Sequence, residues 1–329
     1  MMISNEKAMR LPLLLKGKAQ TRLWGGTRFH SDGGERIGEI WSLSVREREE
    51  ENCTVSGGFF DGMTLKALIE ATDGKIVGGK YRKGDRFPLL IKLLDTSDTL
   101  SLQVHPDGDY AREKGADGGK TEMWYVLDCE KDAYFFYGMK EGYSSEHLAE
   151  AIERGECASL MQTHKASPRD VLFVPAGMPH AIGGGIFLAE IQENSDVTYR
   201  LDDYGRRDAS GKLRELHVAD GLAVSRPFTE EETYALRFSA AKDTPSDTMI
   251  ADTVLFRVSE VEKESVTVEG CFRALIALEA LEVVTAEGDS LPLSAYDTCF
   301  LPAHAGEVTV TGRALLVSVP MLEEESDGT

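Results

Sequence analysis

The sequence is short of basic residues relative to acidic ones. Its 36 Lys and Arg residues face 56 Asp and Glu residues, which gives a formal net charge of -20 at pH 7. Nucleic acids and anionic membrane surfaces attract basic proteins, so this balance argues against both as partners. It is compatible with a small anionic substrate, because a few cations focused in a cleft set the local potential there.

The sequence also lacks a Cys-x-x-Cys motif and any long hydrophobic run. Its five cysteines are odd in number and widely spaced, at Cys53, Cys129, Cys157, Cys271 and Cys299. This usage predicts reduced thiols rather than a disulfide framework. The apolar residues 11–15 are too few for the core of a signal peptide, and no stretch approaches transmembrane length. We therefore expect a cytoplasmic protein.

Short strand-like segments dominate what is there. They are rich in β-branched and aromatic residues, are separated by Gly and Pro, and include residues 37–45, 89–94, 123–127, 133–137 and 171–175. Two short helices are indicated, one at residues 64–71 capped by Thr64 and one at residues 145–154 ended by Gly155. We predict a mainly β fold of two jelly-roll barrels with a few short helices.

Three separated pieces of the chain together predict a metal site. Gln103 and His105 are two residues apart in one strand-like segment, and Lys120 and Glu122 are two apart in another. Because side chains alternate faces along a strand, each pair points to one side. His180 follows a Pro-x-Gly-x-Pro turn that opens a third strand. Two imidazoles, one carboxylate and one amide oxygen suit a divalent ion such as zinc.

Cationic side chains lie close to these motifs in the sequence. Lys120 shares a face with Glu122, so its ammonium is expected in the same cavity. Arg200 and Arg206 follow the metal strands, and in so acidic a chain they predict an anion holder, with phosphate as the natural ligand.

Part of the chain repeats in its C-terminal third. Residues 169–176 (RDVLFVPA) parallel residues 296–303 (YDTCFLPA), which implies a second barrel. The position of His180 in the first copy is Glu307 in the second, so we expect the C-terminal copy to be metal-free and structural. A proline and a charged run near residue 228 predict the linker. The expected domains are residues 1–228, metal-binding and catalytic, and residues 229–329, a degenerate barrel.

These motifs resemble those of type I phosphomannose isomerases in the shorter bacterial form. The matching segments are residues 23–26, 38–42, 101–106, 119–125, 174–180 and 192–200. Several separated motifs that match in the same order make a specific pattern.

The resemblance implies a cupin-type zinc enzyme that interconverts D-mannose 6-phosphate and D-fructose 6-phosphate. By motif position, the zinc ligands would be Gln103, His105, Glu122 and His180. Arg200 would be the active-site arginine, and Lys120, Ser101 and Glu190 would lie at the sugar. Arg206 stands where longer relatives have a lysine implicated in phosphate contact.

The residues fit this chemistry independently of the resemblance. Aldose–ketose isomerisation through an enediol needs a base and stabilisation of negative charge on oxygen. Glu190 is the candidate base, and a zinc-bound hydroxide is an alternative. Two other functions stay open at this point. One is an iron-dependent oxygenase on the same barrel, and the other is a non-catalytic, metal-containing protein that binds sugar phosphates.

Overall fold

The computed structural model describes residues 6–29, 34–207, 210–239 and 249–323. Contacts divide the chain into two compact units. Unit 1 comprises Met1–Lys18, Trp41–Ile91 and Thr244–Thr329, and unit 2 comprises Ala19–Ile40 and Lys92–Asp243. The single boundary expected at residue 228 stays a prediction. Within the described ranges, no helix is both long enough and apolar enough to cross a membrane.

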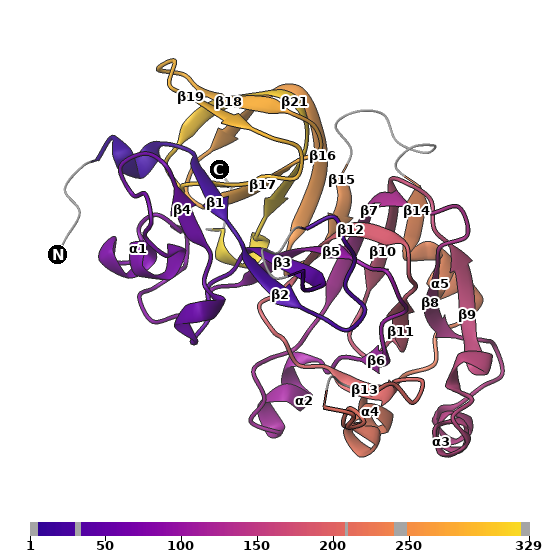
Figure 1. Cartoon of the computed structure of the whole chain (residues 1–329). Helices are drawn as coiled ribbons and strands as arrows, with labels where there is room; N and C mark the ends of the chain where they lie inside the picture. Colours follow the sequence, from indigo (N-terminus) through magenta and orange to yellow (C-terminus); the bar gives the residue numbers. More distant parts are fainter. Residues whose placement is uncertain (1–5, 30–33, 208–209, 240–248, 324–329) are drawn as a thin grey trace. The chain divides into compact units, whose positions relative to one another are not determined.

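Unit 2 carries two sheets, to which strands β3 and β5 also contribute (Figure 1). The seven-stranded sheet has the order β14 (Arg237–Ser239), β10 (Asp170–Val174), β7 (Glu122–Cys129), β12 (Ile186–Glu193), β5 (Leu89–Asp95), β3 (Ile37–Leu43) and β2 (Lys18–Thr21). The five-stranded sheet has the order β13 (Tyr199–Asp202), β6 (Leu102–Val104), β11 (His180–Ile182), β8 (Tyr134–Met139) and β9 (Met161–Lys165).

One hydrophobic core joins these two sheets face to face. It contains Trp124 and Leu188 from the first sheet together with Phe135, Tyr137 and Ile182 from the second. Trp124 and Phe135 stack with their ring centroids 5.3 Å apart. Side chains of both inner faces therefore interdigitate, as in a double-sheet barrel.

A second core covers the outer face of the five-stranded sheet. Leu102, Ala181 and Leu201 pack there with residues of helices α3 (Ser145–Arg154) and α4 (Val218–Val224). Because strand residues alternate, burying these three positions outward turns their neighbours Gln103, His180 and Arg200 toward the inner face. The remaining helices of unit 2 are α2 (Gly108–Glu113), α5 (Glu230–Ala235) and the 3-10 turn η3 (Cys157–Leu160).

Unit 1 is built on a nine-stranded sheet. Its main order is β15 (Met249–Asp252), β16 (Arg257–Val268), β21 (Gly306–Ser318), β17 (Arg273–Ala277), β20 (Thr298–Leu301), β1 (Leu13–Lys16) and β4 (Thr54–Ser56), with β18 (Leu281–Thr285) and β19 (Ser290–Leu293) paired off this path. Helix α1 (Leu65–Ala71) and the 3-10 turns η1 (Ala8–Arg10), η2 (Glu49–Glu51) and η4 (Pro320–Leu322) complete the unit. The mainly β fold class is confirmed.

The expected internal repeat is visible in local geometry. Arg169 and Tyr296, which start the two copies, both have the rare positive φ of non-glycine residues, at 68° and 72°. The Asp that follows each of them accepts a 2.8 Å hydrogen bond from the backbone N–H of the serine three residues earlier. Each copy then continues into a strand, β10 or β20, that pairs antiparallel with an earlier strand, β7 or β17.

Candidate metal centre and active site

His105, Glu122 and His180 meet inside unit 2. One potential ligand atom from each lies within 4.8 Å of the other two, and all three side chains are buried. His180 is directly opposite Gln103 in the pairing of β11 with β6. The amide nitrogen of Gln103 lies 3.4 Å from His180 Nε2, and a half-turn of that amide would present its oxygen instead. The structure thus brings together the four residues predicted as ligands.

Backbone carbonyls fix the orientation of both imidazoles. His105 Nδ1 lies 2.9 Å from the carbonyl oxygen of Val197, and His180 Nδ1 lies 2.7 Å from that of Met178. With Nδ1–H donating to these oxygens, each Nε2 keeps its lone pair for the centre. The two Nε2 atoms lie 3.5 and 3.4 Å from the carboxylate oxygens of Glu122.

Burial keeps both histidines neutral. It lowers the pKa of His105 well below its usual value, and the nearby Lys120 and His180 lower it further. Burial also lowers the pKa of His180 to about 4. Neutral imidazole is the form that binds a metal ion, so these two side chains are ready ligands at neutral pH.

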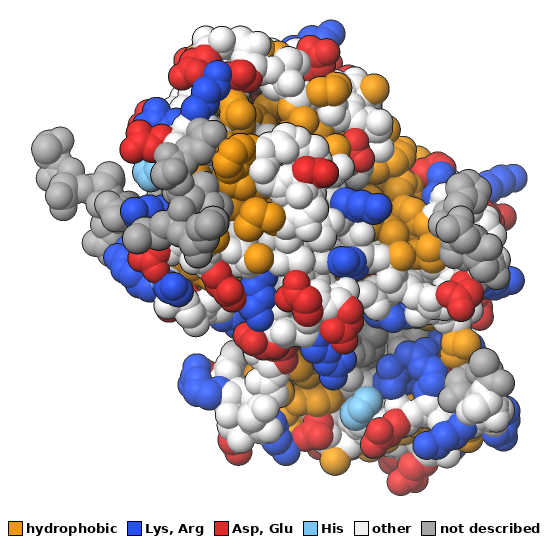
Figure 2. Space-filling view, turned by 60° about the vertical axis from the view of Figure 1, so that its left-hand side comes forward, with side chains coloured by type: hydrophobic (Ala, Val, Ile, Leu, Met, Phe, Trp, Pro, Cys, Tyr) orange, Lys and Arg blue, Asp and Glu red, His pale blue; other side chains and the backbone are white. Residues whose placement is uncertain are grey.

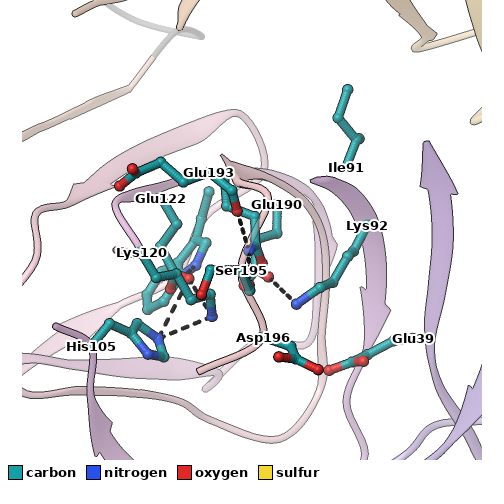
Figure 3. A network of polar contacts seen from close by, with 12 residues as sticks. Glu39, Ile91, Lys92, His105, Lys120, Glu122, Glu190, Glu193, Ser195 and Asp196 are labelled. Atoms are coloured by element: carbon teal, nitrogen blue, oxygen red, sulfur yellow. Dashed lines mark hydrogen bonds and ion pairs between the residues drawn. The ribbon is translucent and has the colours of Figure 1, made fainter. Parts of the chain in front are cut away.

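Lys120 reaches the same point, as predicted. Its Nζ lies 2.7 Å from Glu122 Oε2 and 3.0 Å from His105 Nε2 (Figure 3). Burial opposes the charged form of Lys120, but the carboxylates of Glu122 and Glu190 outweigh that effect and raise its pKa. The contact with Glu122 has the distance of an ion pair without hydrogen-bond geometry. His105, Glu122 and His180 therefore accommodate the positive charge of the Lys120 ammonium. This supports the fit of these three side chains to a metal cation.

A buried ion pair borders this centre. Lys92 Nζ lies 2.8 Å from Glu190 Oε1, and both side chains are at most 6% exposed (Figure 3). Sequence reasoning placed Glu190 at the site but missed Lys92. The signal was available, because Lys92 is the one basic residue inside the strand β5, otherwise apolar up to its final Asp95. A lysine in a fully buried strand requires a partner.

The other three predicted residues differ in how they are placed in the strands and loops: Arg200, Ser101 and Arg206. Arg200 is directly opposite Gln103 in the pairing of β13 with β6. Ser101 is buried two residues before Gln103. Arg206 sits further along the chain in a set of ion pairs with Asp98 and Asp203.

Comparisons with known proteins point to one family. Residues 3–131 match the family model of the phosphomannose isomerase type I catalytic domain. The mannose-6-phosphate isomerase ManA of Bacillus subtilis is 36% identical over 314 residues, which cover 92% of this chain and 96% of that protein. The chain belongs to the type I phosphomannose isomerase family.

A further relative and two solved structures are similar to this chain in sequence or in fold. The mannose-6-phosphate isomerase of Streptococcus mutans is 37% identical over 67% of this chain and 70% of its own length. The crystal structure of the Bacillus subtilis mannose 6-phosphate isomerase has a TM-score of 0.76 at 30% identity, and the match covers 93% of this chain and 98% of that one. A putative mannosephosphate isomerase from Archaeoglobus fulgidus shares the fold with a TM-score of 0.71 at 20% identity.

Proposed function

We propose that this chain is a metal-dependent aldose–ketose isomerase that interconverts D-mannose 6-phosphate and D-fructose 6-phosphate. The observation that carries the proposal is the convergence of His105, Glu122 and His180 beside a buried ammonium, in a chain of this family. Members named mannose-6-phosphate isomerase match it over nearly their whole length.

The proposed cofactor is one Zn2+ ion held by Gln103, His105, Glu122 and His180. This donor set is mixed nitrogen and oxygen with a single negative charge, which suits zinc and leaves the bound ion electron-poor. When bound, the ion supplies Lewis acidity toward oxygens of the sugar. His105 and His180 contribute neutral nitrogen donors whose direction is set by their hydrogen bonds to Val197 and Met178.

Glu190 is proposed as the base that moves the proton. Its carboxylate takes the proton from C2 of open-chain mannose 6-phosphate and returns it to C1, and the hydroxyl proton of O2 passes to O1, so that the enediol becomes fructose 6-phosphate. Lys92 positions that carboxylate through the 2.8 Å ion pair and balances its charge. The Lys120 ammonium, protonated at neutral pH because of its raised pKa, balances negative charge that develops on the substrate oxygen.

The remaining predicted residues are assigned to the substrate. Arg200 and Arg206 are proposed for the phosphate and Ser101 for the sugar. The catalytic role belongs to the expected domain of residues 1–228, and a structural role to residues 229–329. All five cysteines lie in the described ranges and carry free thiols, which supports the proposed cytoplasmic setting.

A coupled assay for fructose 6-phosphate tests the proposal directly. Purified protein should convert mannose 6-phosphate, lose turnover after chelation, and regain it when zinc returns. Arg200→Ala should abolish turnover with metal content retained, whereas His105→Ala should lose both. Metal-replete protein without turnover would contradict the proposal and favour a non-catalytic sugar-phosphate binder.

A further inference from the structure

Arg214 occupies an unusual position for an arginine in a loop. Its neighbours Leu213 and Leu216 are 50% and 41% exposed, whereas the Arg214 side chain is only 23% exposed. The segment thus turns its leucines toward solvent and its guanidinium inward. Burying a guanidinium group costs free energy, whereas burying a leucine side chain is favourable. The reverse arrangement seen here therefore calls for a compensating role of Arg214.

Hydrogen bonds hold the segment that carries Arg214 alongside β13. The backbone N–H of His217 donates a 2.8 Å hydrogen bond to the carbonyl oxygen of Arg200, and the backbone N–H of Arg200 lies 3.2 Å from His217 Nδ1. Arg200 Nη1 donates a 2.7 Å hydrogen bond to the carbonyl oxygen of Glu215, the residue next to Arg214. The two arginines are therefore neighbours in space.

Arg200 in turn lies in a row that leads to the metal centre. It is opposite Gln103 on β6, and Gln103 is opposite His180 on β11. Two strand spacings separate Arg200 from His180, about 10 Å between backbones. All three side chains share the inner face, so the guanidinium of Arg200 is placed for the far end of a substrate whose other end is at the metal.

The guanidinium groups of Arg200 and Arg214 have few partners within the protein. In the described part of the chain, the guanidinium of Arg200 has one hydrogen bond, to a neutral carbonyl oxygen, and its buried Nε has none. Arg214 has one partner, Asp203 Oδ1 at 3.2 Å, and shares that oxygen with Arg206 at 2.6 Å. Burial lowers the pKa of both Arg200 and Arg214, and Arg214 adds to the effect on Arg200.

Arg206 differs from these two because its nitrogens already have partners. Nε and Nη2 contact Asp203, Nη1 contacts Asp98, and Nη1 also donates to the carbonyl oxygen of Thr99. Figure 2 shows acidic and basic side chains spread over the face that it draws, with one group of Lys and Arg side chains beside a hollow in its lower part. A dianion at Arg200 and Arg214 would give both guanidinium groups further acceptors.

We propose that Arg214 is a substrate-binding residue that holds the phosphate group together with Arg200, with Asp203 as its positioning carboxylate. Two guanidinium groups give the planar, multiple hydrogen bonds that phosphate favours. The identity of the substrate, mannose 6-phosphate, rests on the proposed function. The binding of a phosphate dianion by Arg200 and Arg214 does not depend on it.

The test compares Arg214→Gln and Arg214→Lys with Arg207→Gln as a matched control. Arg207 is an exposed neighbour whose Nη1 donates to the carbonyl oxygen of Gly211. Arg214→Gln should raise KM for mannose 6-phosphate about tenfold to a hundredfold, with metal content kept. Competitive inhibition by inorganic phosphate should weaken in proportion. Arg214→Lys should recover part of both losses, and Arg207→Gln should behave as wild type.

Phosphate protection against thermal unfolding provides a readout that does not depend on turnover. Inorganic phosphate should raise the Tm of the wild type and of Arg207→Gln but not that of Arg214→Gln. A wild type without isomerase activity would end the proposed function, yet this comparison would still test the inference. A KM and phosphate inhibition in folded Arg214→Gln within about twofold of wild type would overturn it. Reduced activity of Arg214→Gln together with unchanged inhibition by inorganic phosphate would also overturn the inference.

Discussion

At the scale of single residues, the centre depends on charges that only their neighbours make tolerable. Glu122 is fully buried and has Lys120, His105, His180 and the indole N–H of Trp124 around its two oxygens. It supplies the only negative charge of the proposed ligand set. Removing that charge should therefore weaken the binding of a metal ion.

Glu122→Gln should lose metal affinity by more than about a hundredfold, because the variant keeps the shape of the side chain but not its charge. Metal content after dialysis, measured by mass spectrometry, checks this. Glu113→Gln makes the same change at an exposed position and should keep its metal. Equal metal content in both variants would remove Glu122 from the ligand set.

Lys92→Met should destabilise the protein by about 3–5 kcal/mol, because it leaves the carboxylate of Glu190 buried without its partner. The double variant Lys92→Met, Glu190→Leu should recover much of that loss, since neither charge is then buried. Chemical denaturation of the metal-free forms checks both. Equal stability of the single and double variants would show that the pair is not energetically coupled.

His164 provides a pH prediction away from the metal centre. Burial, followed by the charge of Arg237, lowers its pKa to about 4. The unfolded chain binds this proton near pH 6.5, so between pH 6.5 and 4 the unfolded state holds more protons and stability falls as pH falls. With a discount for partial exposure, the loss is about 1–2 kcal/mol. Denaturation of wild type and His164→Gln at pH 7 and pH 4 measures it. If the free energies of unfolding of the wild type and His164→Gln differ by the same amount at pH 7 and pH 4, this prediction is wrong.

At the scale of elements, period-two alternation is what aims the site. Leu102, Ala181 and Leu201 face the helices, so the residues between or beside them face the metal. The sequence carries this information, which is why the pairs Gln103 with His105 and Lys120 with Glu122 could be placed on common faces. Helices were predictable where a cap was clear: Thr64 accepts the N–H of Ala67, and Gly155 has a φ of 67°.

Other elements gave too weak a local signal. Helices α2, α4 and α5 have only six or seven residues each, and the sequence did not predict them. Tertiary packing decides whether such short helices form. Lys92 was missed for a related reason, since its strand was interpreted as a buried apolar run and the single charge inside it was not weighed.

Gly119 allows the connection that carries Lys120, just before β7, to approach the segment after His105. A Cβ at Gly119 would lie 2.5 Å from the backbone nitrogen of Gly108, so Gly119→Ala must push these segments apart. We expect a loss of about 1–3 kcal/mol and weaker metal binding.

Gly108→Ala is the matched control. A Cβ there meets nothing within 4 Å, and Gly108 begins helix α2, so this variant should be neutral or slightly stabilising. Thermal unfolding and metal titration of the two variants check the pair. Equal behaviour of Gly119→Ala and Gly108→Ala would show that the close approach does not position the site.

At the scale of the whole molecule, the sequence indicated which residues belong to the site but not how the strands are ordered. Local periodicity assigns a face to each residue, whereas the adjacency of β6, β11 and β13 arises from long-range pairing that no short pattern encodes. The sequence did not predict a role for Arg214 for the same reason. Its segment has no regular periodicity, and only the pairing of Arg200 with His217 brings it to the site.

The central claim is that one metal ion bound between β6, β7 and β11 is required for isomerisation. Anomalous diffraction at the zinc edge, on crystals of zinc-loaded protein active in the isomerase assay, tests it most directly. We expect one stoichiometric peak within coordination distance of His105 Nε2, Glu122 and His180 Nε2, together with activity that rises and falls with occupancy of that peak. Full activity with no ion there, or with the ion bound at other side chains, would contradict it.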